Sequence, residues 1–286
     1  MLETDLQSSL SAMPRFRSIV TFIDSDIRLA ERLEMATGIA RAEDAHLTVM
    51  ALRYDLGIPP YAFVDAVGPT MAEALESARS EAEARAKHAE ETLRTADVKG
   101  EVVRCVTLHR DIEREVAEVA RFADLAIVGP PYGDAVSGAA SAILDGILYE
   151  CDLPALVVPD DTTSLDNGTV LIGWDGSRQA LKAVKGALPL LQRADKVEIC
   201  TFDPRREAPG DVLSKMLARY DVKVETAALP KPSGPIAAAI AQRAREIGAG
   251  LLVMGAYGHS RFRESVIGGV TRATLHDVEM PLLLAH

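Results

Sequence analysis

Four glycines are concentrated near the end of the chain, in the stretch GAYGHSRFRESVIGGVT at residues 255–271. Gly255 and Gly258 form a G-x-x-G motif, and a pair, Gly268 and Gly269, follows after nine residues. Glycine loses more backbone freedom on folding than any other residue, so glycines in an ordered segment need a local reason. Backbone without Cβ atoms can turn tightly and lie close to a ligand, and amides at the start of a helix attract anions. The spacing therefore predicts a phosphate cradle, and the alternative is a strand-to-helix turn that binds no ligand.

The glycine pattern differs from two common nucleotide-binding fingerprints. The sequence contains no G-x-x-x-x-G-K-[ST] P-loop, and these glycines do not follow the G-x-G-x-x-G dinucleotide pattern. Arg261 and Arg263 lie between the glycines and are candidates for phosphate contacts, with solvated surface charges as the alternative. His259 has no acid–base partner at a useful spacing, which favours a solvated loop histidine over a catalytic one.

The segments that must position these glycines occur twice in the chain. An apolar run that ends in aspartate and precedes a helical pattern contains Asp24 in its first copy and Asp175 in its second. Two further pairs of similar segments are LAIVGPPYG (125–133) with LLVMGAYG (251–258), and CDLPALVVP (151–159) with VEMPLLLAH (278–286). This repetition indicates two copies of one architecture.

Each half alternates apolar runs with helical patterns, which predicts a parallel β-sheet covered by helices on both faces. Strands are expected near residues 17–24, 45–52, 101–107, 124–129 and 154–159, and again near 169–174, 196–202, 222–228, 250–255 and 281–285. The fold class is therefore α/β, with two tandem doubly wound five-stranded domains at residues 1–160 and 168–286. The polar segment between them is the expected linker. A long helix near residues 70–96 is expected to cover the first sheet, with a partner-binding helix as the alternative.

Composition and charge narrow the class of protein. The 286 residues fit two domains, and 48% of them are hydrophobic, which is enough for a buried core in each. The formal net charge of −11 disfavours a nucleic-acid partner, whereas backbone amides can still bind a small phosphate ligand. No apolar stretch is long enough to span a membrane, and the first residues lack the apolar core of a signal peptide. Cys105, Cys151 and Cys200 lie far apart, which favours buried thiols in the cytoplasm over disulfides or a metal site.

The run at residues 255–271 resembles the ATP-binding signature of the universal stress protein family, G-x-x-G-x9-G-[ST]. The resemblance extends to the aspartate that ends the first strand, to the five alternating strands and to a closing strand of the form x-P-[apolar]4. It covers both halves of the chain as a tandem pair, and it implies an adenine nucleotide alpha hydrolase-like fold. Family members dimerise through the last strand. The resemblance therefore also implies that the two halves pack as an internal pseudo-dimer and that chains form a homodimer.

The resemblance implies a nucleotide site in the second half, residue by residue. The implied contacts are with adenosine for Gly173, Trp174, Asp175 and Thr201, with the nucleotide flanks for Met254 and Gly255, with ribose and phosphates for Tyr257 and Gly258, and with phosphates for Gly268, Gly269, Val270 and Thr271. From the residues alone, Asp175 can instead order a DGS turn in which Ser177 caps the following helix. Trp174 and Met254 can instead be core side chains.

The match to the family is incomplete in two places. Gly269 stands where the family has Ser or Thr, so an amide remains but the hydroxyl is missing. In the first half, the stretch at residues 129–146 follows a retained Asp24 but carries two prolines and an altered spacing. We therefore expect the first half to be structural rather than nucleotide-binding, with a different cradle at Ser137 and Gly138 as the alternative.

These features favour a cytoplasmic stress-response protein that binds ATP, ADP or AMP, with or without Mg²⁺, chiefly in its second half. The sequence shows no Ser/His/Asp arrangement, metal cluster or nucleophile elbow, so binding without catalysis is expected. Two alternatives stay open. One is a slow ATPase in which Asp175 holds the metal. The other is a nucleotide-free dimeric interaction scaffold, which the glycine at position 269 and the altered first half both favour.

Overall fold

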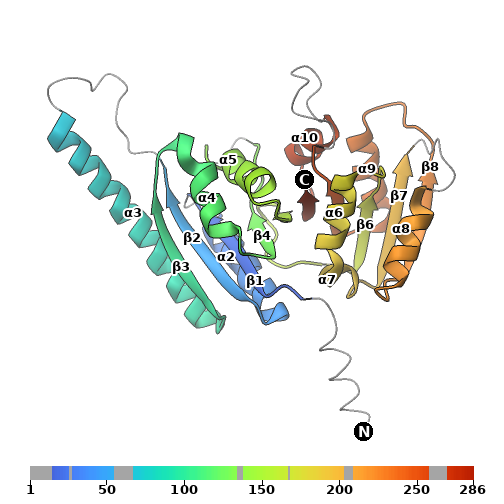
Figure 1. Cartoon of the computed structure of the whole chain (residues 1–286), viewed down its shortest axis with the longest axis horizontal. Helices are drawn as coiled ribbons and strands as arrows, with labels where there is room; N and C mark the ends of the chain where they lie inside the picture. The colour runs from blue at the N-terminus through green and yellow to red at the C-terminus, as the bar shows by residue number, and fades with distance from the viewer. Residues whose placement is uncertain are drawn as a thin grey trace, which may run out of the picture. The chain divides into compact units, whose positions relative to one another are not determined.

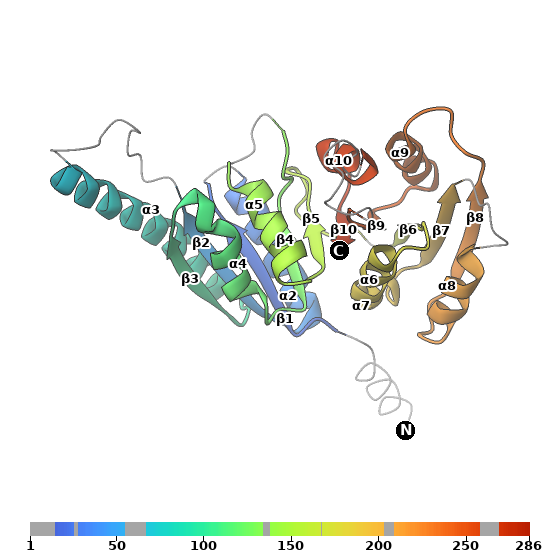
Figure 2. The same cartoon turned by 45° about the horizontal axis from the view of Figure 1, so that its top comes forward.

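The computed structural model describes residues 15–25, 28–54, 67–133, 138–166, 168–202, 209–257 and 269–286. The chain forms two compact units, of which one is Arg17–Ser164 and the other contains Leu165–His286. In both units five strands alternate with helices (Figure 1), and a second view makes the helices on the two faces of each sheet easier to follow (Figure 2).

The amino-terminal unit contains a five-stranded parallel sheet in the order β3-β2-β1-β4-β5. Its strands are β1 (Ser18–Ile23), β2 (His46–Arg53), β3 (Gly100–Val106), β4 (Leu125–Val128) and β5 (Ala155–Val157). Its helical segments are α2 (Leu29–Glu43), α3 (Val67–Ala96), the short turn η1 (His109–Asp111), α4 (Ile112–Ala120), α5 (Ala140–Asp145) and η2 (Gly146–Glu150). Helices α2 and α3 cover one face of the sheet, and α4 and α5 cover the other (Figure 1).

The carboxy-terminal unit repeats this plan in the order β10-β9-β6-β7-β8. Its strands are β6 (Thr169–Gly173), β7 (Lys196–Phe202), β8 (Val224–Leu229), β9 (Leu251–Gly255) and β10 (Leu282–Ala285). Its helices are α6 (Arg178–Gly186), α7 (Leu188–Leu191), α8 (Pro209–Ala218), α9 (Ile236–Ile247) and α10 (Gly269–His276). Helices α9 and α10 lie side by side on one face of the sheet, opposite α6, α7 and α8 (Figure 2).

All ten predicted strands are present, and their ends differ from the predictions by at most two residues. The helix expected near residues 70–96 is α3, and its buried side chains are Ala78, Ala82, Ala86, Ala89 and Leu93. Because alanine is small, this helix can lie close to the sheet. The α/β class and the two doubly wound sheets are confirmed, whereas the pairing of the two units as a pseudo-dimer stays a prediction.

The strand order of the carboxy-terminal unit brings three strand ends together. Strand β6 pairs with β7 on one side and with β9 on the other, so that Gly173 lies opposite both Cys200 and Met254. The chain crossovers reverse direction at this point, and crevices for ligands form beyond the carboxyl ends of the strands there. The topology therefore directs the search for a site to the ends of β6, β7 and β9.

The three cysteines are free thiols, of which Cys200 is fully buried and Cys105 and Cys151 are half-buried. Burial raises the pKa of Cys105 and that of Cys200 to about 11. These thiols are therefore protonated at neutral pH, which suits a structural role better than a reactive one. In the part of the chain that the structure describes, no helix is both long and apolar enough to cross a membrane.

We expect the carboxy-terminal unit to lose stability above pH 9 because of Cys200. A thiol in the unfolded chain loses its proton near pH 9, whereas the buried thiol keeps its proton up to about pH 11. Between these values the unfolded state binds fewer protons, so the free energy of unfolding falls by about 1.4 kcal/mol per pH unit. Urea unfolding at pH 8 and pH 10, followed by the fluorescence of the single tryptophan, measures this loss. The loss should be smaller in Cys200→Ala, and an equal loss in both proteins would contradict the assignment.

Candidate functional site

A cavity of about 330 Å³ opens at the carboxyl ends of β6, β7 and β9, between the first turns of α9 and the start of α10. Its lining residues are Gly173, Trp174, Asp175, Cys200, Phe202, Ile236, Ile240, Met254, Gly255, Gly269, Val270 and Thr271. The volume lies in the range of small-molecule sites, and most of these side chains are apolar. Among these described lining residues, Asp175 is the single charged one.

Eight of the twelve residues predicted for the site line this cavity. The eight are Gly173, Trp174, Asp175, Met254, Gly255, Gly269, Val270 and Thr271. Thr201 and Tyr257 do not line it, and Gly258 and Gly268 lie outside the described residues, as do His259, Arg261 and Arg263. The structure thus brings together stretches from β6, β9 and α10 that lie far apart in the sequence.

Strand β7 contributes Cys200 and Phe202 to the cavity, not Thr201. Side chains alternate between the two faces of a strand, so residues two apart share a face. Cys200 and Phe202 lie on the face toward α9, whereas Thr201, only 6% exposed, is buried on the opposite face. The prediction for Thr201 identified the correct strand and the wrong face. Counting in steps of two along β7 from Phe202 would have found the correct side chains.

Asp175 and Ser177 form the turn that leads from β6 to α6. The backbone N–H of Ser177 donates to Asp175 Oδ1 at 2.9 Å, and the N–H of Ala180 donates to Ser177 Oγ at 3.1 Å, so Ser177 caps α6. Gly176 between them has a φ of 79°, in the region that glycine favours. The Asp175 side chain is exposed at the cavity, and its Oδ2 accepts no hydrogen bond from the described residues. The turn and a ligand can therefore use different oxygens of one carboxylate.

A hydrogen bond holds the segment after β9 against α10. The N–H of Tyr257 donates to Thr271 Oγ1 at an N–O distance of 3.2 Å. Tyr257 has a φ of 51°, a backbone conformation that costs about 1–2 kcal/mol for a residue with a side chain. Thr271 is buried, and its hydroxyl accepts this bond while keeping a proton that it can donate. The wall of the cavity is therefore built around a constrained turn at Tyr257.

The two described glycines of the motif have different surroundings. A Cβ atom at Gly255 would lie 2.5 Å from the backbone nitrogen of Ala180 and 2.8 Å from the carbonyl carbon of Gln179. The missing side chain at Gly255 therefore lets the start of α6 pack directly against the end of β9. Among the described residues, a Cβ atom at Gly269 would meet no atom within 4 Å. The space beside Gly269 is open, so a ligand or a small side chain can occupy it.

Helix α9 supplies the apolar wall of the cavity. Ile240 is buried, and Ile236 is 41% exposed. Three residues beyond Ile240, Arg243 donates two hydrogen bonds to the carboxylate of Glu198 on β7, each 2.7 Å long. The Glu198 side chain is only 3% exposed, and these hydrogen bonds raise the pKa of Arg243 above its usual value. The ion pair ties α9 to the strand on which the cavity rests.

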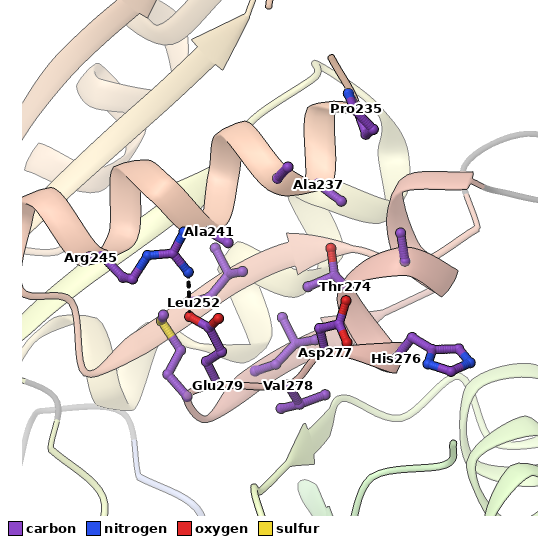
Figure 3. Close-up of a pocket in the computed structure, with 14 residues that line it drawn as sticks. Pro235, Ala237, Ala241, Arg245, Leu252, Thr274, His276, Asp277, Val278 and Glu279 are labelled. Carbon is purple, nitrogen blue, oxygen red and sulfur yellow. Dashed lines mark hydrogen bonds and ion pairs between the residues drawn. The ribbon is translucent and has the colours of Figure 1, made fainter. Parts of the chain in front are cut away.

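A larger cavity of about 610 Å³ lies further along α9, between α9 and α10 (Figure 3). We call it the α9–α10 groove. Its lining includes Ala237, Ala241 and Arg245 from α9 and Asp277 from the end of α10, and Arg245 forms a 2.6 Å ion pair with Glu279 (Figure 3). The groove lacks the glycines and strand ends of the smaller cavity, which is therefore the better candidate site. Within the described residues, no three His, Cys, Asp or Glu side chains gather to hold a metal ion.

The aspartate that ends the first strand is differently placed in the amino-terminal unit. Asp24 is buried, and Arg32 Nη1 donates to Asp24 Oδ1 and to the carbonyl oxygen of Phe22, at 3.3 Å each. The guanidinium of Arg32 also fills the space beside Gly129, where a Cβ atom would lie 2.4 Å from its Nη2. The carboxylate that faces a cavity in one unit is therefore neutralised by helix α2 in the other.

The amino-terminal unit also brings together three segments that surround the cavity in its counterpart. Tyr54 follows β2, His109 precedes α4 and Gly138 precedes α5. The Tyr54 and His109 rings meet edge to face with centroids 5.7 Å apart, and His109 Nε2 lies 3.0 Å from the carbonyl oxygen of Gly138. These contacts favour the structural role predicted for this half. Of the alternative cradle there, Gly138 takes part in these contacts and Ser137 lies outside the described residues.

Comparison with known proteins gives a family match for the carboxy-terminal part of the chain. The model of the universal stress protein family matches residues 167–286. This match covers the carboxy-terminal unit. A universal stress protein of Synechocystis sp. is 30% identical over 152 residues, which cover 51% of this chain and 51% of that protein. The match thus spans about half the length of that relative.

Two solved structures share the fold. A universal stress protein from Archaeoglobus fulgidus has a TM-score of 0.72 and 15% identity, over 94% of this chain and 97% of that chain. A functionally unknown protein from Pseudomonas aeruginosa PAO1 has a TM-score of 0.55 and 14% identity, over 97% of this chain and 94% of that chain. At these identities the likeness shows the fold and nothing about ligands.

We expect Gly255→Ala to destabilise the carboxy-terminal unit by about 1–3 kcal/mol, because the new methyl group would press on the backbone of α6. Gly129→Ala is the matched control. It is the equivalent glycine of the other unit, but the nearest atoms to its new methyl group belong to the flexible end of Arg32, so the loss should be smaller and should reflect the Arg32–Asp24 pair. Urea unfolding followed by Trp174 fluorescence measures the first effect, and circular dichroism measures both. Equal stability of Gly255→Ala and wild type would show that α6 does not need this close approach.

Proposed function

We propose that this protein is a universal stress protein that binds one adenine nucleotide in the cavity of its carboxy-terminal unit and acts in the cytoplasm as a non-catalytic stress-response protein. The observation that carries the proposal is the convergence of the predicted residues. Eight residues implied by the resemblance to a nucleotide-binding family line one cavity at the point of the sheet where ligands of this fold class bind. A turn without a binding role would not require these separate segments to enclose an open space.

The chemistry of the lining suits the parts of an adenine nucleotide. The side chains of Phe202, Ile236, Ile240 and Met254 offer an apolar slot for a flat base. The exposed Oδ2 of Asp175 can accept a hydrogen bond from an amino or hydroxyl group. The start of α10 presents backbone amides, which attract phosphate oxygens.

We propose binding rather than turnover because the described lining offers little for phosphoryl transfer. Such enzymes use a residue that orients the attacking water and groups that hold Mg²⁺ against the phosphates. Asp175 is the single carboxylate of the described lining, and one of its oxygens is bonded to the turn at Ser177. A Mg²⁺ ion would therefore be held chiefly by the phosphates of the nucleotide.

We expect one adenine nucleotide per chain, because Asp24 of the amino-terminal unit is paired with Arg32. Denaturing the freshly purified protein and identifying the released nucleotide by chromatography and mass gives the ratio and the number of phosphates. Asp175→Ala should weaken rebinding in calorimetric titration about tenfold to a hundredfold, because it removes a hydrogen bond to a charged group.

Ser177→Ala is the control for this titration, because it removes the helix cap and keeps the carboxylate. A ratio of two would show that the amino-terminal unit also binds nucleotide. ATP loss on incubation that survives repeated purification and disappears in Asp175→Ala would favour the slow ATPase. No released nucleotide, followed by no heat on titration with ATP and Mg²⁺, would favour the scaffold.

We expect Gly269→Ser to tighten binding of ATP about fivefold and to leave the affinity for adenosine unchanged. The position has open space for the side chain, and the new hydroxyl can donate to a phosphate oxygen for about 1 kcal/mol. Gly269→Ala is the control, because it fills the same space without a donor. Titration of each variant with ATP and with adenosine separates a gain in affinity at the phosphates from a gain at the nucleoside. Equal tightening for both ligands would place the phosphates away from the start of α10.

A further inference from the structure

Helix α9 lines two cavities. The face that carries Ile236 and Ile240 lines the candidate nucleotide site. The face that carries Ala237, Ala241 and Arg245 lines the α9–α10 groove (Figure 3). Residues three and four apart lie on one side of a helix, so each set forms a continuous stripe. The wall of the candidate site is therefore a helix with open space beside it, along a neighbouring stripe.

Apolar packing gives α9 little hold on the sheet. Only Ile240 and Ala244 are buried among its twelve residues. The side chains that face the groove are small, and the groove beside them measures about 610 Å³. Apolar contacts have no preferred direction, so two buried side chains do not fix where a helix of this length lies along a strand.

The contact between Arg243 and Glu198 supplies the direction that apolar packing lacks. The guanidinium donates from Nε and from Nη2 to the two oxygens of one carboxylate, at 2.7 Å each. Such a two-pronged contact restricts both position and angle. Glu198 shares a face of β7 with Cys200 and Phe202, because it is two and four residues away from them. The pair therefore relates α9 to the strand that forms the floor of the cavity.

We propose that the Glu198–Arg243 pair positions α9 as the movable wall of the nucleotide cavity, and that the α9–α10 groove is the space into which this wall can shift. The inference rests on the proposed function for its ligand, an adenine nucleotide, and extends it to a residue pair that lies outside the lining. Arg243 is a positioning residue, because it acts on the ligand through Ile236 and Ile240.

The chain contains a matched control on the same helix. Arg245 lies two residues beyond Arg243 and also pairs with a glutamate, at 2.6 Å, but it does so across the groove (Figure 3). The side chains of Arg245 and Glu279 are 55% and 51% exposed, so water screens their attraction. Loss of Arg245 should therefore leave α9 in place.

The test uses the whole chain and a thiol that reports the position of α9 without any ligand. Cys200 is 1% exposed and lines the cavity beside α9, so its alkylation requires movement of the wall. Glu198→Gln combined with Arg243→Met removes both charges and leaves no buried charge unpaired. The alkylation rate of Cys200 is measured by peptide mass with N-ethylmaleimide, and the affinity for AMP is measured by calorimetry. Arg243→Lys keeps the charge and loses the two-pronged contact.

In the double variant we expect Cys200 to react about tenfold faster than in the wild type and AMP to bind about tenfold more weakly. Arg243→Lys should give an alkylation rate and an affinity between those of the double variant and the wild type. Arg245→Met should match the wild type in both measurements. Unchanged alkylation and affinity in the double variant would overturn the positioning role while the proposed function stands. If no variant, including the wild type, binds AMP but Cys200 alkylation accelerates only when Arg243 is changed, the proposed function fails and the positioning role stands.

Discussion

The close approach of helix α6 to the end of strand β9 is the constraint on which the candidate site depends. Gly255 has no side chain, so the backbone at Ala180 can lie against it. This contact determines where α6 begins, and Ser177 caps it there. The turn before the cap then holds the Asp175 carboxylate at the mouth of the cavity. The missing side chain at Gly255 thus sets the distance between the end of β9 and helix α6, which follows β6.

The two units show how the same topology loses this arrangement. Helix α6 begins three residues after Asp175, whereas α2 begins five residues after Asp24. The later start leaves space beside Gly129, which Arg32 fills from the second turn of α2. Its guanidinium then neutralises Asp24, and the carboxylate is buried instead of exposed. Both units keep the aspartate and the glycine, and they differ in where the following helix begins. Asp175 is exposed at a cavity in one unit, whereas Asp24 is buried against Arg32 in the other.

The sequence predicted the features that depend on neighbours along the chain. Alternating apolar runs predicted every strand, and the glycine motif predicted which strand ends matter. Features that depend on distant residues could not be predicted in this way. Thr201 was expected in the cavity because the motif identifies a strand and not a face. The pairing of Glu198 with Arg243 joins residues 45 positions apart, and many other arginines were equally available in the sequence. The missing side chain at Gly255 was interpreted as room for a ligand, although the nearest atoms beside it belong to helix α6.

Buried charge and empty space have complementary roles around α9. A helix packed on all sides by apolar residues would be fixed by its shape, and its wall of the cavity could not adapt. A helix that lines two cavities and buries few side chains needs a directional contact to fix its position. The pair between Glu198 and Arg243 meets that need, because loss of Arg243 would leave the Glu198 carboxylate, only 3% exposed, without this partner. The same pair lies outside the lining of the cavity. It can therefore position α9 without placing a charged side chain against the adenine base. The ion pair therefore determines the position of α9, and the apolar side chains of α9 provide the surface that contacts a ligand.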